Sequence, residues 1–130
     1  MQEMSTAVQY NLPIKIFIIN NQYMGMVRQW QELLHEKNYS ESYTAALPDF
    51  VKLAEAYGCI GLRANKPEEL DEKIGEMLSV NKPVIFDCVV DKAENCYPMI
   101  PSGKPHNQML LGDKDKDNED KISDEGKILV

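Results

Sequence analysis

The stretch that decides the fold is IKIFIINN, residues 14–21, in which a short apolar run ends at a pair of asparagines. Its β-branched and aromatic residues favour an extended strand. Because the run is almost continuously apolar, it is typical of a strand that is covered on both faces in a parallel sheet. Pro13 lies directly before the strand and ends any helix that precedes it.

Outward from this strand, helices and strands alternate along the chain. Apolar runs at 59–64 and 84–90 predict two further strands. Apolar residues at helical spacing predict helices over 2–10, 26–34, 50–57 and 67–78. Asp49 is suited to cap the third helix and Gly58 to end it in the left-handed conformation. This order predicts an α/β fold, a three-layer parallel sheet with helices on both faces and right-handed crossovers.

Composition limits the classes of function. The chain has 130 residues, 43% hydrophobic and 27% charged, which suits one globular domain. Its net charge of -7 argues against nucleic acid and anionic membrane surfaces as partners.

Cys59, Cys88 and Cys96 have no paired spacing, so we expect buried free thiols without a disulfide or zinc site. With no spanning segment and no leader pattern, we expect a cytoplasmic chain.

The end of the first strand is a candidate ligand site. In open parallel sheets ligands bind at the carboxyl ends of the strands, and Asn20-Asn21 lies at such an end. Amide oxygens and turn carbonyls suit a magnesium ion that also binds phosphate. Gly25 lets the backbone approach a diphosphate closely. By itself, however, Asn-Asn after a strand is more often a plain turn.

Other candidate residues also have structural interpretations. Met26 and Trp30 lie on an apolar helical stripe, which is more often helix core than a cofactor contact. Asp87, within a predicted strand, is interpreted as an edge residue or as the acceptor of a local backbone donor. His35 and His106 have no metal-ligand spacing and are assigned no role.

Longer motifs carry a resemblance to a known family. They are MQEMSTA (1–7), IKIFIINNQYMGMVRQWQ (14–31), the pair at 39–40, PDFVKLAEAYG (48–58) and PMIPSG (98–103). Up to Leu111 the chain resembles the large, catalytic subunits of acetolactate synthases (acetohydroxyacid synthases). Asn-Asn is shared by many thiamine-diphosphate enzymes, whereas GMVRQW and PMIPSG are particular to this family.

The resemblance implies a thiamine-diphosphate-binding fold in which Mg²⁺ holds the cofactor. It assigns Asn21 as a side-chain ligand of the metal and Tyr23 as a ligand through its backbone carbonyl. Gly25 and Met26 are assigned to cofactor binding, with Met26 packing on the cofactor.

The resemblance also assigns residues to the substrate pocket. Trp30 is expected to shape the pocket for the acceptor 2-oxo acid, and Ser102 to border the substrate entrance. Ser102 has no base visible in the sequence, so we interpret it as a turn residue and not as a nucleophile.

Some parts of the family's site are expected outside this chain. The diphosphate motif of the family opens with Gly-Asp about 27 residues before its second asparagine, and the sequence before Asn21 is shorter than that. The fold is therefore expected to be incomplete at its N-terminus. No catalytic residue is assigned here, because the cofactor-activating glutamate is expected in another domain, on a neighbouring subunit. FAD belongs to the full-length family member, in a domain absent here.

The implied activity is the condensation of pyruvate with a second 2-oxo acid, in the biosynthesis of valine, leucine and isoleucine. The implied partners are small 2-oxo acids, copies of the full-length subunit in a homodimer or homotetramer, and a small regulatory subunit. Alternatives are another thiamine-diphosphate enzyme, such as a glyoxylate carboligase or pyruvate oxidase, and a truncated binding module without catalysis. Trp30 and residues 98–103 argue against the first alternative, and the missing Gly-Asp favours the second for the isolated chain.

Two segments are expected along the chain. Residues 1–111 are assigned to the C-terminal part of the thiamine-diphosphate-binding domain. Residues 112–130 are assigned to a charged tail with a short helix near 122–129. Without the strand that bears Gly-Asp, we expect an open sheet edge, uncovered apolar helix faces, and poor solubility or self-association.

Overall fold

The computed structural model describes residues 2–112, and the chain divides into two compact units. Unit 1 comprises residues 1–23 and 43–93, and unit 2 comprises residues 24–42 and 94–130. The short helix predicted near 122–129 lies outside the described residues.

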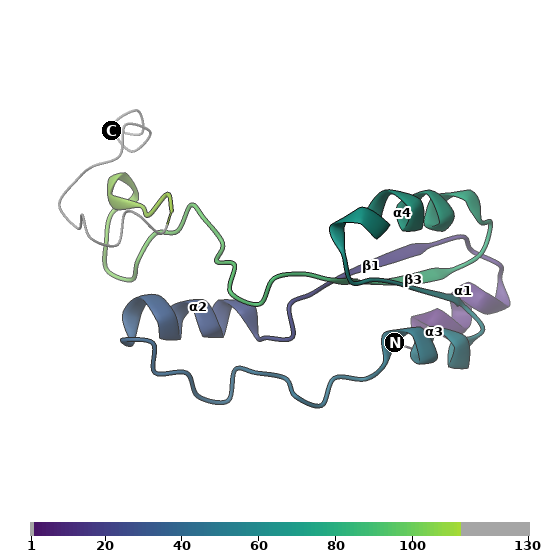
Figure 1. The fold of residues 1–130 in the computed structure, drawn as a ribbon, viewed down its shortest axis with the longest axis horizontal. Helices are drawn as coiled ribbons and strands as arrows, with labels where there is room; N and C mark the ends of the chain where they lie inside the picture. The colour runs from purple at the N-terminus through teal and green to yellow at the C-terminus, as the bar shows by residue number, and fades with distance from the viewer. Residues whose placement is uncertain (1, 113–130) are drawn as a thin grey trace. The chain divides into compact units, whose positions relative to one another are not determined.

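Unit 1 is built on a parallel three-stranded sheet (Figure 1). Its strands β1 (Lys15–Asn20), β2 (Ile60–Ala64) and β3 (Val84–Val89) lie in the order β1-β3-β2, so β3 is central. The register pairs the last residues of β1 and β2 with the end of β3, which brings the three carboxyl ends to one edge of the sheet. The predicted strands and their parallel arrangement are confirmed.

Helices cover both faces of this sheet, as predicted. Figure 1 shows α4 (Leu70–Ser79) on one side of the strands and α1 (Glu3–Gln9) with α3 (Phe50–Tyr57) on the other. Two apolar clusters correspond to the two faces. The α4 face contains the buried residues Leu62, Ala64, Met77, Val84, Phe86 and Cys88. The other face contains Met4, Ala54, Cys59 and Ile85.

The ends of the helices follow local chemistry. Asp49 accepts hydrogen bonds from the N–H groups of Val51 and Lys52 at 3.1 and 3.4 Å, and Gly58 ends α3 with φ 80°. Both ends of α3 therefore lie where the sequence predicts them. The helix predicted from residue 67 begins instead as a 3-10 turn, η1 (Pro67–Glu69), which leads into α4. Such tight turns are common at helix N-termini.

Unit 2 contains α2 (Gly25–Leu34) and the segment after residue 93, with the 3-10 turn η2 (His106–Gln108). Met99 and Leu110 form an antiparallel bridge through two backbone hydrogen bonds of 2.9 and 2.7 Å. Between residues 2 and 112, none of the helices combines the length and the apolar character needed to traverse a bilayer.

Gly61 on β2 lies close against the backbone of α3. A Cβ atom at this position would lie 2.7 Å from the carbonyl oxygen of Val51 and 2.9 Å from its Cα atom. These are backbone atoms that cannot move without the helix. We predict that Gly61→Ala lowers the free energy of unfolding by about 1–3 kcal/mol, as overpacking does in a close-packed core.

Gly75 provides a matched control for this substitution. It lies in the exposed middle of α4, where an added Cβ would meet no heavy atom within 4 Å. Gly75→Ala should raise the free energy of unfolding by about 0.5–1 kcal/mol, because alanine is the better helix former. Chemical denaturation measures both variants, and effects of the same sign would contradict the close packing at Gly61.

Candidate functional site

The turn after β1 is held by the side chains of both asparagines. Asn20 is buried; its Nδ2 donates to Asp87 Oδ1 at 2.8 Å, and its Oδ1 accepts the N–H of Gln22 at 3.1 Å. The Oδ1 atom of Asn21 accepts the N–H of Tyr23 at 3.1 Å. Gln22 has φ 58°, a left-handed conformation that is costly for a non-glycine residue. The conformation of the turn is therefore specified by both asparagine side chains.

Residues 43 and 44 fix the same turn from a second direction. Thr44 donates to the carbonyl oxygen of Gln22 through both its N–H, at 3.0 Å, and its Oγ1, at 2.7 Å. Tyr23 and Tyr43 form an antiparallel bridge, with ring centroids 5.0 Å apart. The two predicted metal ligands, Asn21 and the carbonyl of Tyr23, thus belong to a turn whose backbone is fixed on both sides.

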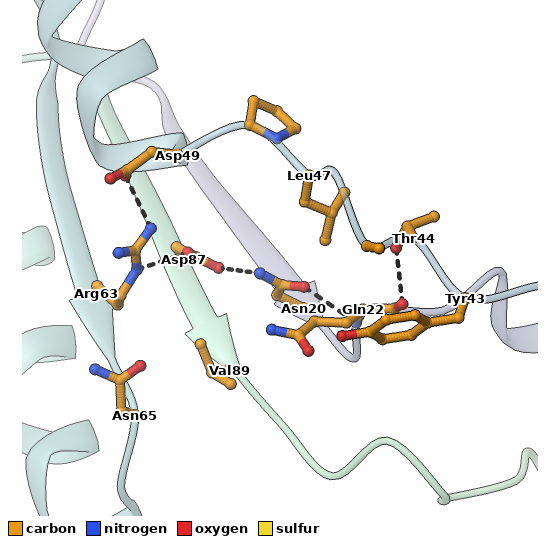
Figure 2. Close-up of a pocket in the computed structure, with 12 residues that line it drawn as sticks. Asn20, Gln22, Tyr43, Thr44, Leu47, Asp49, Arg63, Asn65, Asp87 and Val89 are labelled. Carbon is orange, nitrogen blue, oxygen red and sulfur yellow. Dashed lines mark hydrogen bonds and ion pairs between the residues drawn. The ribbon is translucent and has the colours of Figure 1, made fainter.

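An ion-pair network lies behind the turn, at the carboxyl ends of the strands (Figure 2). Asp87 on β3 is only 1% exposed, and its Oδ2 accepts from Arg63 Nε at 2.8 Å while its Oδ1 binds Asn20. Arg63 also donates through Nη2 to Asp49 Oδ1 at 2.9 Å. One chain of hydrogen bonds thereby joins β1, β3, β2 and the first turn of α3.

The network accounts for the protonation states around it. The hydrogen bond to Asp87 raises the pKa of Arg63 above its ordinary value, against the opposing effect of partial burial. The backbone N–H of Lys52 lowers the pKa of Asp49, and the charge of Arg63 lowers it further. Arg63 and Asp49 therefore stay charged near neutral pH.

The sequence-based interpretation of Asp87 is wrong. Asp87 lies on the central strand instead of an edge, and its carboxylate accepts hydrogen bonds from the side chains of Asn20 and Arg63. The reason is that Asn20 and Arg63 lie on the two strands that flank β3: Arg63 is directly opposite Asp87, and Asn20 is the last residue of β1. Only the pairing of the strands reveals these partners.

A cavity of about 360 Å³ opens over this network at the edge where the strands end. Figure 2 shows Asn20, Gln22, Arg63 and Asp87 around it, with Thr44 on the loop that leads to α3. Ligand sites of open parallel sheets occupy this position. Within residues 2–112, no group of three or more His, Cys, Asp or Glu side chains could hold a metal ion. A metal ion bound here would therefore need oxygen ligands from groups other than a cluster of these side chains.

In unit 2, α2 has its polar side buried. Gln29 is 1% exposed, and its amide binds the backbone of Cys96 twice: Oε1 accepts the N–H at 2.7 Å, and Nε2 donates to the carbonyl oxygen at 2.9 Å. Nε2 also lies 3.0 Å from the sulfur of Met99. Arg28, also buried, donates to Asn95 Oδ1 at 3.2 Å and pairs with Glu32 at 2.8 Å. These polar contacts attach the segment 95–99 to α2.

The apolar side of α2 consequently faces outward. Met26 is 55% exposed and Trp30 is 45% exposed, so neither contributes to a core among the described residues. They line a shallow hollow together with Val27, Gln31 and His35. The interpretation of this stripe as helix core is therefore wrong for these two side chains. An apolar face held outward by buried polar contacts is suited to receive an apolar ligand.

The predicted site residues are divided between the two units. Asn21 and Tyr23 belong to unit 1, whereas Gly25, Met26, Trp30 and Ser102 belong to unit 2. Ser102 lies in a turn and lines a cavity of about 190 Å³ with Leu33, Leu34, Pro101, Lys104, Gln108 and Leu110. This cavity is distinct from the hollow beside Trp30.

An open parallel sheet whose first strand ends in an Asn-Asn turn held by side chains is typical of a cofactor-binding α/β domain. Residues 1–88 match the family "Thiamine pyrophosphate enzyme, C-terminal TPP binding domain". The chain belongs to this family, so the class predicted from the sequence is confirmed.

Two similar proteins are large subunits of acetolactate synthases. The acetolactate synthase large subunit of Cyanidium caldarium is 50% identical over 85% of this chain and 19% of its own length. Acetolactate synthase isozyme 3 large subunit of Escherichia coli is 45% identical over 85% of this chain and 20% of its own. The predicted resemblance is confirmed, and the chain spans about a fifth of the length of these curated relatives.

A solved structure supports the fold. The thiamine diphosphate-dependent 4-hydroxybenzoylformate decarboxylase of Rhodococcus jostii RHA1 superimposes with a TM-score of 0.59 and 26% identity. The match covers 69% of this chain and 17% of that one.

The three cysteines differ in their surroundings. Burial raises the pKa of the Cys59 and Cys88 thiols above the ordinary value, and the nearby charge of Asp87 raises that of Cys88 further. Cys96 is exposed, so the expectation of buried thiols is wrong there. Its segment is attached to α2 through the backbone, which leaves the side chain outside.

We predict that Cys96 reacts with iodoacetamide on the order of tenfold faster than Cys59 and Cys88, because thiolate reactivity requires exposure and deprotonation. Because the folded state raises the pKa of Cys59 and Cys88, their contribution to stability is complete below the ordinary thiol pKa and is lost as the pH rises from that value through the raised one. Mass spectrometry of alkylated peptides measures the three rates. Equal rates at neutral pH would contradict the assigned burial.

Proposed function

We propose that this chain is the cofactor-binding part of an acetolactate synthase large subunit. The proposed reaction condenses pyruvate with a second 2-oxo acid in branched-chain amino-acid biosynthesis, with thiamine diphosphate and Mg²⁺. The main support for this proposal is the exposed apolar side of α2 with Met26 and Trp30. It occurs in a chain that is 50% identical, over 85% of its residues, to an acetolactate synthase large subunit. Because the chain spans about a fifth of such relatives, we expect the isolated chain to bind without turnover.

The turn after β1 fits a magnesium ion that is shared with a diphosphate. The N–H of Tyr23 orients Asn21 Oδ1, and an amide oxygen has a second lone pair for a cation. Mg²⁺ prefers octahedral oxygen ligands and commonly takes several from phosphate and water. Asn21 and the backbone carbonyl of Tyr23 supply neutral oxygens, so the diphosphate contributes negative charge. Asn20 is unsuited, because both ends of its amide bind within the protein.

The start of α2 fits the remainder of the cofactor. When bound, thiamine diphosphate supplies a nucleophilic carbon and an electron sink. Gly25, the first residue of α2, permits close approach of the backbone, and the N–H groups of a helix start favour an anionic group. Met26 offers an exposed apolar side chain that packs on the cofactor and excludes water from it.

Trp30 and Ser102 are assigned to the substrates. Trp30 lies four residues after Met26 and therefore on the same side of α2. Its large ring limits the size of the acceptor 2-oxo acid beside the cofactor. We assign Ser102 to the border of the substrate entrance, where its turn position lets the backbone reverse direction.

The proposal extends to the assembly. It includes a homodimer or homotetramer of the full-length subunit, a small regulatory subunit, FAD in the full-length protein and a cytoplasmic location. These features rest on the likeness to acetolactate synthase large subunits.

Calorimetric titration with thiamine diphosphate, with Mg²⁺ or with a chelator, tests the proposed half-site. We expect binding that requires the metal. Asn21→Ala should weaken it by about tenfold or more, because a ligand and its orienting hydrogen bond are both lost. Asn21→Asp keeps an oxygen at that position and should retain metal-dependent binding.

Asn81→Ala is the matched control, since Asn81 is exposed and lies before β3, at the amino ends of the strands. It should bind as the wild type does. Metal-independent binding, or equal affinities of Asn21→Ala and Asn81→Ala, would contradict the assignment of Asn21 as a metal ligand. No binding by the wild type would overturn the proposal that this chain forms a competent half-site.

A further inference from the structure

The carbonyl oxygen of Gln22, which the proposed function does not use, accepts two hydrogen bonds from Thr44. The N–H of Thr44 donates to it at 3.0 Å, and Oγ1 of Thr44 donates to it at 2.7 Å. The second distance is the usual length of a hydroxyl hydrogen bond. Two donors from one residue therefore fix the direction of this carbonyl group.

The peptide that joins Gln22 to Tyr23 carries this constraint to Asn21. A trans peptide is planar, and its C=O and N–H groups point in opposite directions. The C=O group of this peptide accepts from Thr44, whereas its N–H group, that of Tyr23, donates to Asn21 Oδ1 at 3.1 Å. Through one rigid plane, Thr44 therefore fixes the donor that orients Asn21 Oδ1.

Gln22 needs such a constraint because its backbone is strained. Its φ of 58° lies in the left-handed region, which residues other than glycine seldom adopt. A conformation of this kind persists only where the surrounding groups hold it. Asn20 Oδ1 holds the N–H of Gln22 at 3.1 Å, and Thr44 holds the carbonyl oxygen. Loss of the Thr44 hydroxyl should therefore let the Gln22–Tyr23 peptide populate other orientations.

The loop that carries Thr44 is itself anchored beside the turn. Tyr43 and Tyr23 form an antiparallel bridge, and their ring centroids lie 5.0 Å apart. Lys92 Nζ lies 5.4 Å from the centroid of the Tyr43 ring, which is a cation–π contact. Figure 2 shows Thr44 and Tyr43 beside Gln22. These contacts give Thr44 a defined place from which to hold the turn.

We propose that Thr44 is a positioning residue for the metal: by fixing the Gln22–Tyr23 peptide, it holds Asn21 Oδ1 in the orientation that binds Mg²⁺. This inference rests on the proposed role of Asn21 as a metal ligand. Orientation matters for Mg²⁺ because this ion demands nearly ideal octahedral geometry at short distances. A ligand that is already oriented in the free chain binds more tightly, since no part of the binding free energy is needed to select its conformation.

Thr44→Val removes the hydroxyl donor and keeps the branched shape of the side chain. Calorimetry should show that its Mg²⁺-dependent affinity for thiamine diphosphate is about threefold to tenfold weaker than that of the wild type, the effect of one lost hydrogen bond. Thr44→Ser supplies the same donor and should bind within about twofold of the wild type.

The choice of metal separates positioning from a general loss of stability. Ca²⁺ accepts longer and less regular oxygen contacts than Mg²⁺ does. Thr44→Val should therefore weaken Ca²⁺-supported binding of thiamine diphosphate by less than about twofold, so the preference for Mg²⁺ over Ca²⁺ falls. A variant that is only less stable loses affinity to the same extent with both ions.

Amide hydrogen exchange tests the same contact in the chain without cofactor or metal. In Thr44→Val the N–H of Tyr23 should exchange about threefold faster or more, because its peptide is less firmly held. The N–H of Val90, which donates at 3.1 Å to the carbonyl oxygen of Asn20 at the end of β1, should keep its wild-type rate.

Thr6→Val is the matched control, since Thr6 is the other threonine of the sequence and is exposed on α1. It should leave the affinity, the metal preference and the exchange rates unchanged. Equal affinities of Thr44→Val and Thr6→Val would overturn the role of Thr44, as would an equal loss with both metals. A Thr44→Ser variant as weak as Thr44→Val, or an unchanged exchange rate at Tyr23, would also overturn it.

The wild type distinguishes the failure of this inference from that of the proposed function. If the wild type shows no metal-dependent binding, the proposed function fails and the role of Thr44 fails with it. If the wild type binds and Asn21→Ala weakens binding but Thr44→Val does not, the role of Thr44 fails alone.

Discussion

The carboxylate of Asp87 is the interaction on which the site depends. It is almost fully buried on the central strand, yet it binds a side chain from each neighbouring strand: Asn20 from β1 and Arg63 from β2. A buried carboxylate is tolerated only when it is paired and hydrogen-bonded. Its two partners therefore have little freedom. Arg63 extends the constraint to Asp49 at the start of α3, and Asn20 extends it to the turn that carries Asn21.

In unit 2 a buried polar side chain is likewise held by its hydrogen-bond partners, but the groups involved are neutral. The amide of Gln29 satisfies the N–H and the C=O of Cys96, as a neighbouring strand would. Leaving a buried amide unsatisfied costs about 1–3 kcal/mol, so this side of α2 is committed to the segment 95–99. Because the side of α2 that carries Gln29 is bound to this segment, Met26 and Trp30 on the other side of the helix are exposed.

The fold could be predicted from the sequence because its signals are local. Apolar runs such as residues 14–19 indicate buried strands, and the cap at Asp49 with the left-handed Gly58 marks both ends of α3. The site was only partly predictable. Helical periodicity identifies which residues share a side of α2 but not which side is buried, and nothing near Asp87 in the sequence reveals partners 24 and 67 residues away. The roles of Asn21 and Tyr23 came from resemblance.

The most direct test asks whether the carboxylate of Asp87 stabilises, through Asn20, the backbone of the turn after β1. Amide hydrogen exchange of Gln22 and Tyr23 should accelerate in Asp87→Ala, because Asn20 loses its partner and no longer holds the N–H of Gln22. The N–H of Ile60, which donates to Pro83 O at the other end of the sheet, should keep its protection. Asp71→Ala, an exposed carboxylate on α4, should change neither. Unchanged exchange of Gln22 and Tyr23 in a folded Asp87→Ala variant would contradict the account.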